Sequence, residues 1–546
     1  MTARLGLSVA AAVLLVTGVA RASETQELLR RRVEDVRGGA EMRIGRDRIA
    51  STRVLASLYE RNGFALAWTR RDALLELLAA VVDAETHGLD PDDYHRPELE
   101  RLLAREPLDA EERVDLDLLA TDALVRLAYH LVFGKVDPER LDPHWNLARE
   151  IDGEEAVAAI RSTIEAPSVL LAIERFAPPH PAYARFRGAL IRYRELALRG
   201  GFERVPEGPK LELGSEGPRV ATLRRRLAAE GDLPREEAAG SSFDAALDAA
   251  VRRAQARHGL EPDGVAGRAT LAALNVPVDE RVDQIRLNLE RARWVLHAVQ
   301  GRLVLVDVAG FHLHSFEDGS DWITRVIVGR PYRKTPIFRS TIRYLVLNPT
   351  WTVPPTIFAQ DMLPALRKDP GYLAKKRLRV IDARGREIDA RGIDWSTVSR
   401  KSFPYLLRQD PGPENALGRI KFVFPNPYSV YLHDTPAQEL FAKAERAASS
   451  GCIRVEDPLT LAVSLLADAE NWSREALERE IATGVTRTVN LREPVPVIVM
   501  YWTVDVDPDG TVQFKRDLYD RDADLLRALD ENFSFRRRAI AGGQGL

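Results

Sequence analysis

The chain has 546 residues, one cysteine and a formal net charge of −3. The nearly balanced charge argues against nucleic acid as a partner, and a lone cysteine excludes an internal disulfide framework, so the fold must rest on packed apolar cores. At about 150 residues a domain, the length predicts about three or four domains.

Residues 1–22 have the pattern of a secretory signal peptide. Arg4 gives a positive start, Leu5–Val19 is an apolar run, and Ala20-Arg21-Ala22 fits a small-x-small cleavage site. The run of 15 residues is shorter than the roughly 20 that a membrane-spanning helix needs. We therefore expect export to the periplasm and a mature protein without an integral membrane span; an uncleaved anchor is the alternative. Cleavage removes two arginines and no acid, which takes the net charge from −3 to −5.

Residues 23–205 predict a helical scaffold domain. Ala, Leu, Arg and Glu dominate, and stretches such as 72–82 place apolar residues at helical spacing behind an acidic start. His87 and His95 lie with aspartates in the loops between such stretches. A metal site is one interpretation of these loops, but helix capping and turn formation explain the same residues, and we predict no metal.

Residues 210–275 predict a compact unit of three helices after a break rich in glycine and proline. Helices are expected to begin at Gly217-Pro218 and Phe243-Asp244, and the stretch from His258 to Leu271 is expected to end in a third short helix. The later part of this stretch, Asp-Gly-Val-x-Gly-x-x-Thr-Leu, resembles the peptidoglycan-binding-domain-1 family. The resemblance implies that the unit binds the cell wall; the alternative is a helical bundle that has kept the fold without the ligand.

The pattern changes from helical to β beyond residue 301. We expect a linker helix at 276–301 and then a β-rich domain over 302–530, with strands such as 322–328 and 341–347.

Residues 356–415 interrupt this β pattern. They combine a helical stretch with basic Lys375-Lys376-Arg377 and the Pro/Gly-rich segment 410–413. An insertion between a strand and an active-site loop is a candidate lid or substrate platform, so we predict a capping insertion. Residues 531–546 predict a loose C-terminal tail.

The lone cysteine, Cys452, is the strongest functional signal in the chain. It follows Ser449-Ser450-Gly451, and His433, the last histidine of the chain, lies nineteen residues upstream. An unpaired thiol in an exported protein is open to oxidation, which suggests a function. Thiolate is the reactive form of cysteine, and a nearby imidazole can take the proton. We therefore predict Cys452 as nucleophile and His433 as its base, rather than an inert buried cysteine.

The residues around Cys452 suggest how a substrate is held. Gly451 lets the backbone approach a carbonyl group, so the N–H groups of Gly451 and Cys452 are candidates for an oxyanion hole. If the segment is extended, Arg454 points to the same side as the thiol, where it is suited to bind a substrate carboxylate. A structural salt bridge from Arg454 to Glu456 or Asp457 is equally open.

His433-Asp434-Thr435 and Ser449-Ser450-Gly451-Cys452-Ile453-Arg454 together resemble the active-site signature of the L,D-transpeptidase (YkuD) family. The usual form is His-Gly-Thr followed by Ser-His-Gly-Cys-Ile-Arg. Asp434 and Ser450 depart from it, and both departures are similar to the large YcbB-type subgroup. Ser450 replaces a histidine that orients substrate in other branches of the family, and that role does not carry over to a serine. By its position, Ser450 is still a candidate substrate contact.

The subgroup resemblance implies the fold class and covers nearly all of the mature chain. It implies a multidomain α+β protein with a helical N-terminal scaffold and a three-helix binding module. These are followed by a β-rich YkuD-type catalytic domain with a capping insertion.

The resemblance also implies roles for single residues. Cys452 is the expected nucleophile, His433 the general base and then acid, and the backbone carbonyl of Asp434 the group that orients the imidazole. Tyr431 and Trp351 match positions that line the donor pocket. Tyr431 also alternates with His433 along a strand, and Trp351 is equally suited to a core position.

The implied reaction has two halves and needs no cofactor. The thiol attacks the L-centre carbonyl of the third residue of a peptidoglycan tetrapeptide stem, and the terminal D-alanine leaves. The thioester then passes to the side-chain amine of diaminopimelate on a second stem, which makes a 3→3 cross-link. The expected partners are therefore donor and acceptor stems, with envelope proteins as further candidates, and carbapenem acylation of the thiol is a family-level expectation.

Two alternatives stay open. One is the same acyl-enzyme with water or an envelope protein amine as acceptor, which gives hydrolysis, attachment or release. The other is a non-catalytic scaffold in which residues 210–275 bind the wall.

Overall fold

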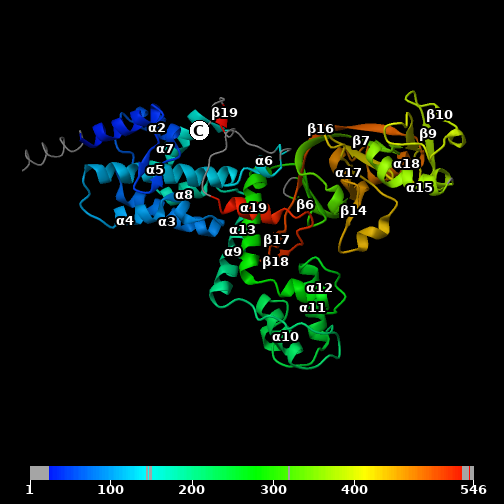
Figure 1. Cartoon of the computed structure of the whole chain (residues 1–546), viewed down its shortest axis with the longest axis horizontal. Coiled ribbons are helices and arrows are strands. Elements are labelled where there is room, and N and C mark those ends of the chain that lie inside the picture. The colour runs from blue at the N-terminus through cyan, green and yellow to red at the C-terminus, as the bar shows by residue number, and fades with distance from the viewer. Residues whose placement is uncertain are drawn as a thin grey trace, which may run out of the picture.

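The computed structural model describes residues 24–142, 145–146, 151–317, 320–369, 371–531 and 540–541. Figure 1 shows a helical scaffold at one end, a small three-helix module below the centre, and a β-rich domain that carries a cap at the far end. The predicted signal peptide and most of the predicted tail lie outside the described residues. Of the helices within these ranges, none combines the length and the apolar character that crossing a membrane requires.

The scaffold is a bundle of helices around α5 (Ala110–Phe133), which is buried along most of its length. The Asp109 carboxylate accepts a hydrogen bond from the Glu112 N–H, and the Glu112 carboxylate accepts one from the Asp109 N–H. This capping box satisfies N–H groups that a helix start leaves unpaired. The helices around α5 are 24–37, α2 (Thr52–Arg61), α3 (Arg71–Asp83), α4 (Arg96–Leu103), α7 (Gly153–Ile164), α8 (Val169–Glu174) and α9 (Pro181–Leu198). The shorter elements are β1 (Arg43–Ile44), β2 (Asp47–Arg48), η1 (Ala84–His87), η2 (Pro91–Tyr94), α6 (Pro138–Leu141), and β3 (Ile151–Asp152) paired with β19 (Ile540–Ala541).

The three-helix module has an apolar core of its own. Its helices are α10 (Pro218–Glu230), α11 (Ala245–Arg257) and α12 (Arg268–Leu274), with a short turn η3 (Arg235–Glu237) between the first two. The Gln255 amide donates to Asp263 Oδ1 at 2.7 Å and to Thr270 Oγ1 at 3.1 Å, and its oxygen accepts from the Gly264 N–H at 2.9 Å. The Asp-Gly-Val motif is therefore held from within the module by a buried side chain.

The helix expected as a linker, α13 (Val278–Val295), is a central buried helix. It packs against α5, α9 and the C-terminal helix α19 (Asp522–Leu529). Glu290 and Arg293 are both fully buried and pair at 2.5 Å, and the Trp294 indole also donates to Glu290. A charge out of water needs such partners. The many charged residues of α13 do not suggest a buried helix. The helix can nevertheless be buried because charged residues such as Glu290 and Arg293 pair within it.

The β-rich domain is built on a sheet of nine strands in the order β14-β6-β15-β13-β12-β7-β16-β4-β5. Strand β5 also pairs with β6, so the ring of pairings closes, which leaves few edges for pairing with other chains. Apolar residues of this sheet and of the scaffold form one continuous core. The strands are β4 (Leu303–Asp307), β5 (His312–Glu317), β6 (Ser320–Gly329), β7 (Phe338–Leu347), β12 (Ile420–Val423), β13 (Leu432–His433), β14 (Ala447–Ser449), β15 (Ile453–Val455) and β16 (Arg487–Met500). Helices and turns of this domain are η4 (Leu296–Ala298), η5 (Pro331–Arg333), η8 (Gln438–Ala442), α17 (Pro458–Leu466) and α18 (Arg474–Ala482).

The cap is a separate small unit between β7 and β12. Its four strands run in the order β10-β9-β11-β8 and its apolar core is distinct from that of the main sheet. The entering strand β8 pairs with the leaving strand β11, so the chain enters and leaves the cap through neighbouring strands. The cap elements are β8 (Trp351–Thr352), α14 (Pro355–Ile357), the π-helical turn η6 (Phe358–Met362), α15 (Leu363–Lys368), α16 (Tyr372–Lys375), β9 (Leu378–Ile381), β10 (Glu387–Ile388), η7 (Ala390–Gly392) and β11 (Leu406–Gln409).

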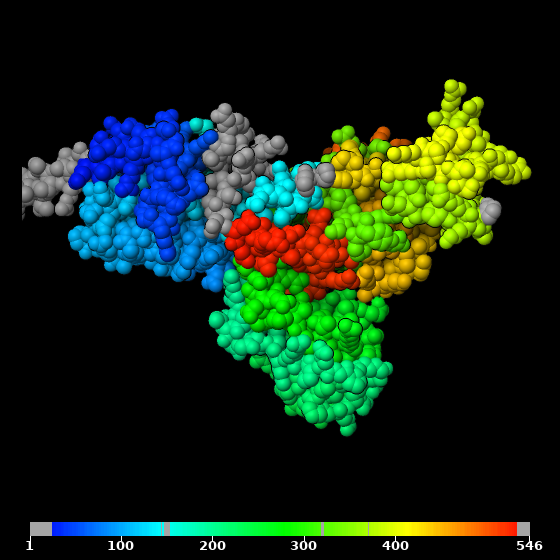
Figure 2. Space-filling view, viewed as in Figure 1, coloured from blue at the N-terminus to red at the C-terminus, as the bar shows by residue number. Residues whose placement is uncertain are grey.

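The segment after β16 joins the parts of the molecule. Its hairpin, β17 (Val504–Val506) and β18 (Val512–Phe514), contacts α9, α11 and α13, and α19 packs on α13. Figure 2 shows this segment in red where the scaffold, the module and the β-rich domain meet. Arg257 of the module donates to the Val512 carbonyl at 3.2 Å, and Arg291 of α13 pairs with Asp522 at 2.7 Å. The end of the predicted 302–530 domain is thus an interface segment outside the main sheet.

Candidate active site

A cleft of about 1010 Å³ lies between the cap and the main sheet. Six of the residues predicted from the sequence line it: Trp351, Tyr431, His433, Ser450, Cys452 and Arg454. The other two, Asp434 and Gly451, are the chain neighbours of His433 and Cys452.

The strand register brings the key side chains to one face. Strands β13 and β15 pair in parallel with His433 opposite Arg454, which sets Tyr431 level with Cys452. On the other side of β13, Lys421 of β12 lies opposite His433. Because alternate residues of a strand share a face, these five side chains belong to the same face of three neighbouring strands.

The His433 ring is buried and oriented by a backbone carbonyl. Its Nδ1 lies 2.5 Å from the carbonyl oxygen of Asp434, so Nδ1 carries the donated proton and Nε2 keeps its lone pair. Burial, together with the nearby Arg454 guanidinium, lowers the pKa of His433 to about 3. The imidazole is therefore neutral at neutral pH and able to accept a proton at Nε2.

The Asp434 carboxylate braces the loop instead of the imidazole. Its Oδ2 accepts hydrogen bonds from the backbone N–H and the Nε of Arg419, both at 2.9 Å. Gly418 packs against it so closely that an added Cβ would lie 2.5 Å from the Asp434 side chain. Only the carbonyl of Asp434 therefore serves His433, which is the contact that the family resemblance implies.

The Cys452 thiol is partly buried at the floor of the cleft. Sγ donates a long hydrogen bond of 3.8 Å to the Ser429 carbonyl. Burial raises the pKa of Cys452, and the Tyr431 backbone N–H and the Lys421 ammonium only partly oppose that shift. At neutral pH the thiol and the imidazole are therefore both uncharged.

The Gly451 amide differs from its predicted role. Its N–H donates to Ser449 Oγ at 3.1 Å, so it does not face the cleft as an oxyanion donor. Its carbonyl accepts from Thr335 Oγ1 at 3.0 Å. Among the residues that the structure describes, the Cys452 N–H has no hydrogen-bond acceptor. One of the two predicted oxyanion donors is therefore open, and the other is occupied.

Arg454 has no ion pair within the described part of the chain. Glu456 pairs instead with Arg325. Asp457 caps α17 and lies 3.6 Å from Arg474. The structural salt bridge considered above is therefore excluded. Arg454 Nε is buried without an acceptor among the described residues, and the side chain lines the cleft. Such a cation is a candidate binding group for an anionic part of a ligand.

The remaining predicted contacts each have a second partner. Trp351 lines the cleft and also packs against the cap core, and its role in a donor pocket stays a prediction. The Tyr431 ring covers the Lys421 ammonium, with Nζ 3.8 Å from the ring centre. The Ser450 hydroxyl accepts a hydrogen bond from Arg333 at 2.8 Å.

Three family models match the chain. Residues 53–190 match a scaffold domain, residues 216–274 a putative peptidoglycan binding domain, and residues 301–496 an L,D-transpeptidase catalytic domain. The last match contains the whole signature of His433 and Cys452. The chain carries a YkuD-type L,D-transpeptidase catalytic domain. This recognition and the multidomain α+β fold predicted from the sequence are confirmed.

A curated relative agrees with this assignment. The putative L,D-transpeptidase of Haemophilus influenzae is 33% identical over 243 residues, which cover 44% of this chain and 48% of that protein. The match thus spans about half of the relative's length.

Two solved structures are also similar. One is the L,D-transpeptidase (residues 123-326) of Xylanimonas cellulosilytica, with 16% identity, TM-score 0.17, and coverage of 54% of this chain and 99% of that one. The other is an L,D-transpeptidase of Stackebrandtia nassauensis, with 17% identity, TM-score 0.22, and coverage of 54% and 96%.

Two cations of the YkuD-type domain were missed from the sequence. Lys421 lies under the Tyr431 ring; burial lowers its pKa, whereas a negatively charged Cys452 would raise it. The one sequence signal for Lys421 was its position in a predicted strand between the apolar residues Ile420 and Phe422. Arg333 contacts both Ser450 and the cap. These contacts join three segments that are distant in the sequence, and no local sequence pattern predicts them.

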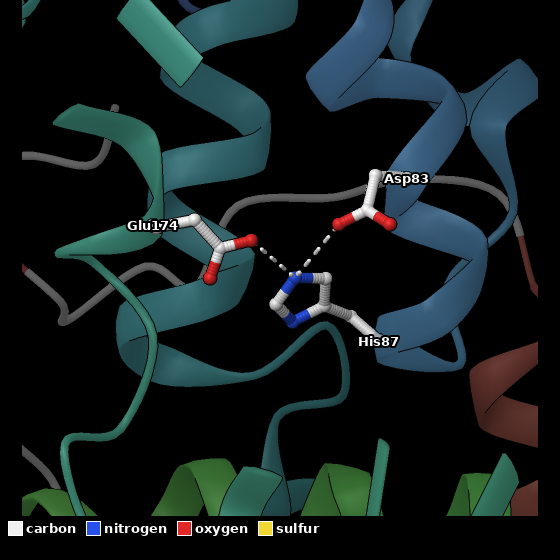
Figure 3. Close-up of side chains that lie close together, drawn as sticks. All are labelled: Asp83, His87 and Glu174. Carbon is white, nitrogen blue, oxygen red and sulfur yellow. Dashed lines mark ion pairs between the residues drawn. The ribbon is translucent and has the colours of Figure 1, made fainter. Parts of the chain in front are cut away.

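Among the described residues of the scaffold, one cluster has the residue types of a metal site. Asp83, His87 and Glu174 face one another (Figure 3), and His87 Nε2 lies 3.8 Å from Asp83 and 3.5 Å from Glu174. Arg187 pairs with both carboxylates, at 2.7 Å and 3.0 Å. The guanidinium supplies the positive charge that a metal ion would otherwise bring, so we interpret the cluster as an ion-pair network that joins α3, α8 and α9.

Proposed function

We propose that the chain is a cysteine-dependent L,D-transpeptidase that forms 3→3 peptidoglycan cross-links with release of D-alanine. The observation that carries the proposal is the face shared by His433, Cys452 and Arg454 at one cleft, where Arg454 has no ion pair with any residue that the structure describes. The YkuD-type domain and the curated relative support transpeptidase activity in general. The thioester and the bond formed are the proposed part.

In the first half-reaction, Cys452 Sγ attacks the L-centre carbonyl carbon of the third stem residue. His433 Nε2 takes the thiol proton as the carbon–sulfur bond forms and the carbonyl oxygen becomes an oxyanion. The N–H of Cys452 is the proposed donor to that oxygen. Collapse breaks the peptide bond, and the amine of D-alanine leaves with the proton from His433.

In the second half-reaction, the thioester passes to an amine. The diaminopimelate amine of an acceptor stem attacks the thioester carbon and gives a proton to His433. The carbon–sulfur bond breaks, and the thiolate of Cys452 takes the proton back. The enzyme is restored without a net gain or loss of protons, so the chemistry needs only residues of the site.

Arg454 is the proposed binding group for a stem carboxylate. It is a buried guanidinium that lacks a carboxylate partner among the described residues, and a planar guanidinium binds carboxylates bidentately. The cleft volume of about 1010 Å³ is at the upper end of ordinary ligand sites, which hold about 300–1,000 Å³. An extended stem peptide fits such a site better than a small metabolite does.

The cell wall is the proposed partner and the periplasm the proposed location. The putative peptidoglycan binding domain and the catalytic domain act on the same polymer in this proposal. Export rests on the pattern of residues 1–22. Envelope proteins remain candidate acceptors through their amines.

The test is product and intact-protein mass spectrometry on the mature enzyme with disaccharide tetrapeptide. We expect a thioester on the wild type and a dimer formed with loss of one D-alanine. Cys452→Ala should fold and give neither product. Arg454→Lys should raise KM more than it lowers kcat, because charge is kept and bidentate geometry is lost. A tripeptide without dimer would move the assignment to hydrolysis or to another acceptor, and an unmodified wild-type thiol would refute the proposal.

A further inference from the structure

The peptide unit between Gly451 and Cys452 joins the predicted oxyanion donor to a distant side chain. In a trans peptide the C=O and the following N–H point in opposite directions and rotate as one plane. The Gly451 carbonyl accepts from Thr335 Oγ1 at 3.0 Å. Whatever fixes this carbonyl therefore also fixes the direction of the Cys452 N–H.

Thr335 is fully buried, and its hydroxyl has a defined direction. The Gly329 N–H donates to Thr335 Oγ1 at 2.9 Å. An N–H can only donate, so it occupies a lone pair of the hydroxyl and leaves the single hydroxyl proton for Gly451. The contact at Gly451 is thus the one position to which this proton is directed.

Tyr519 holds the Thr335 turn from the C-terminal segment. Its hydroxyl accepts from the Thr335 N–H at 3.1 Å and donates to the Gly329 carbonyl at 2.6 Å. The turn is tightly packed against residue 329: a Cβ added at Gly329 would lie 2.1 Å from the Arg333 carbonyl oxygen. The Thr335 hydroxyl is consequently presented to Gly451 by a rigid frame.

The nucleophile loop needs such a frame. Gly451 has φ +114°, a region in which glycine moves at little cost, so the adjoining peptide is free to flip unless it is held. Ser449 Oγ holds the Gly451 N–H on one side and donates to the Cys452 carbonyl. Neither of these contacts fixes the peptide plane that carries the Cys452 N–H.

We propose that Thr335, held by Tyr519, is a positioning residue that aims the Cys452 N–H at the oxyanion. This inference rests on the acyl-enzyme chemistry of the proposed function. Thr335 does not touch substrate; it sets the peptide plane from behind. A flipped plane would turn the Gly451 carbonyl toward the cleft, where it would repel a developing negative charge.

The test compares two reactions of the same thiol. Acylation by the tetrapeptide or by a carbapenem passes through an oxyanion, whereas alkylation by iodoacetamide does not. The variants are Thr335→Val, which keeps the shape and removes the hydroxyl, and Thr335→Ser, which restores it. The matched control is Thr503→Val: Thr503 is also fully buried, and its hydroxyl is bonded to Asn288 and Asp522 and not to the Thr335 turn or to residues 449–452.

We expect Thr335→Val to slow acylation about 100-fold, the lower end of the loss for one oxyanion donor, while alkylation stays near the wild-type rate. Thr335→Ser should recover most of the acylation rate, and Thr503→Val should leave the ratio of the two rates unchanged whatever it does to Tm. Unchanged acylation in Thr335→Val, or a parallel fall of both rates, would overturn the inference. A wild type that is alkylated but never acylated would overturn the proposed function and this inference with it.

Discussion

The Nδ1 atom of His433 lies 2.5 Å from the carbonyl oxygen of Asp434, and this contact decides which imidazole nitrogen is left to accept a proton. A carbonyl oxygen only accepts, so Nδ1 carries hydrogen and Nε2 is the nitrogen left for the proposed role of base. The orienting group is uncharged, and it therefore does not favour the imidazolium as a carboxylate would. With burial added, the imidazole rests neutral, which shapes how the thiol responds to pH.

The rate of Cys452 alkylation should depend on pH without an acidic plateau. Burial raises the pKa of the thiol, and a His433 with a pKa of about 3 carries no charge to stabilise a thiolate at neutral pH. Alkylation by iodoacetamide should rise with pH through a midpoint above the ordinary cysteine value of about 8.5. Mass spectrometry of timed reactions gives the profile, and fast, pH-independent alkylation between pH 5 and 7 would indicate a thiolate–imidazolium pair instead.

Replacing Lys421 should make the thiol less acidic. The ammonium lies on the same strand face and favours the thiolate form of Cys452. We expect Lys421→Met to slow alkylation at pH 8 by up to about tenfold, which corresponds to one pKa unit. Lys421→Arg keeps the charge and should stay near the wild-type rate. Equal rates for Met and Arg at this position would show that the charge has no influence on the thiol.

Gly418→Ala should damage the site more than an otherwise similar glycine substitution. Gly418 has φ +60°, and an added Cβ would lie 2.5 Å from Asp434, whose carbonyl orients His433. Gly484 has φ +67° with open space around it, so Gly484→Ala carries the backbone strain of about 1–2 kcal/mol without the clash. Both variants should lose stability in a denaturant titration, and only Gly418→Ala should also lose acylation. Similar activities in the two variants would contradict the role given to this contact.

Arg333→Ala should loosen the cap over Cys452, the proposed nucleophile. The guanidinium pairs with Asp361 and contacts Gln360 in the cap, and it also donates to Ser450 beside Cys452. Because the pair is partly exposed, we expect less than about 1 kcal/mol of stability to be lost. Hydrogen exchange of residues 356–415 should nevertheless become faster, and acylation slower.

The control for this prediction is Arg379→Ala. Arg379 pairs with Glu387 and Asp410, both within the cap, and does not reach the nucleophile loop. Its replacement should leave acylation unchanged. If the two variants alter exchange and acylation alike, the link from Arg333 to Ser450 has no special effect.

Local sequence patterns were enough to predict several features of the fold and of the candidate site. The pair of Cys452 and His433 stands out because each lies in a short, glycine- or proline-marked segment whose neighbours have defined chemistry. Strand alternation correctly anticipated that Arg454 shares a face with the thiol, since that depends only on two residues within one strand. Helical spacing and turn residues likewise located the three helices of the module.

What the sequence determined by itself was therefore the fold class and the family resemblance, and it also singled out Cys452 and His433 as the candidate pair, because periodicity and short motifs are properties of neighbouring residues. Tertiary structure alone decided that Ser449 occupies the Gly451 amide, that no acidic residue in the described part of the chain pairs with Arg454, and that α13 is buried. It also decided that Thr335 holds a carbonyl 116 residues along the chain. Hydrogen bonds of this kind form only where the fold brings two distant segments within about 3 Å of one another. The spacing of residues along one sequence does not predict which segments will meet.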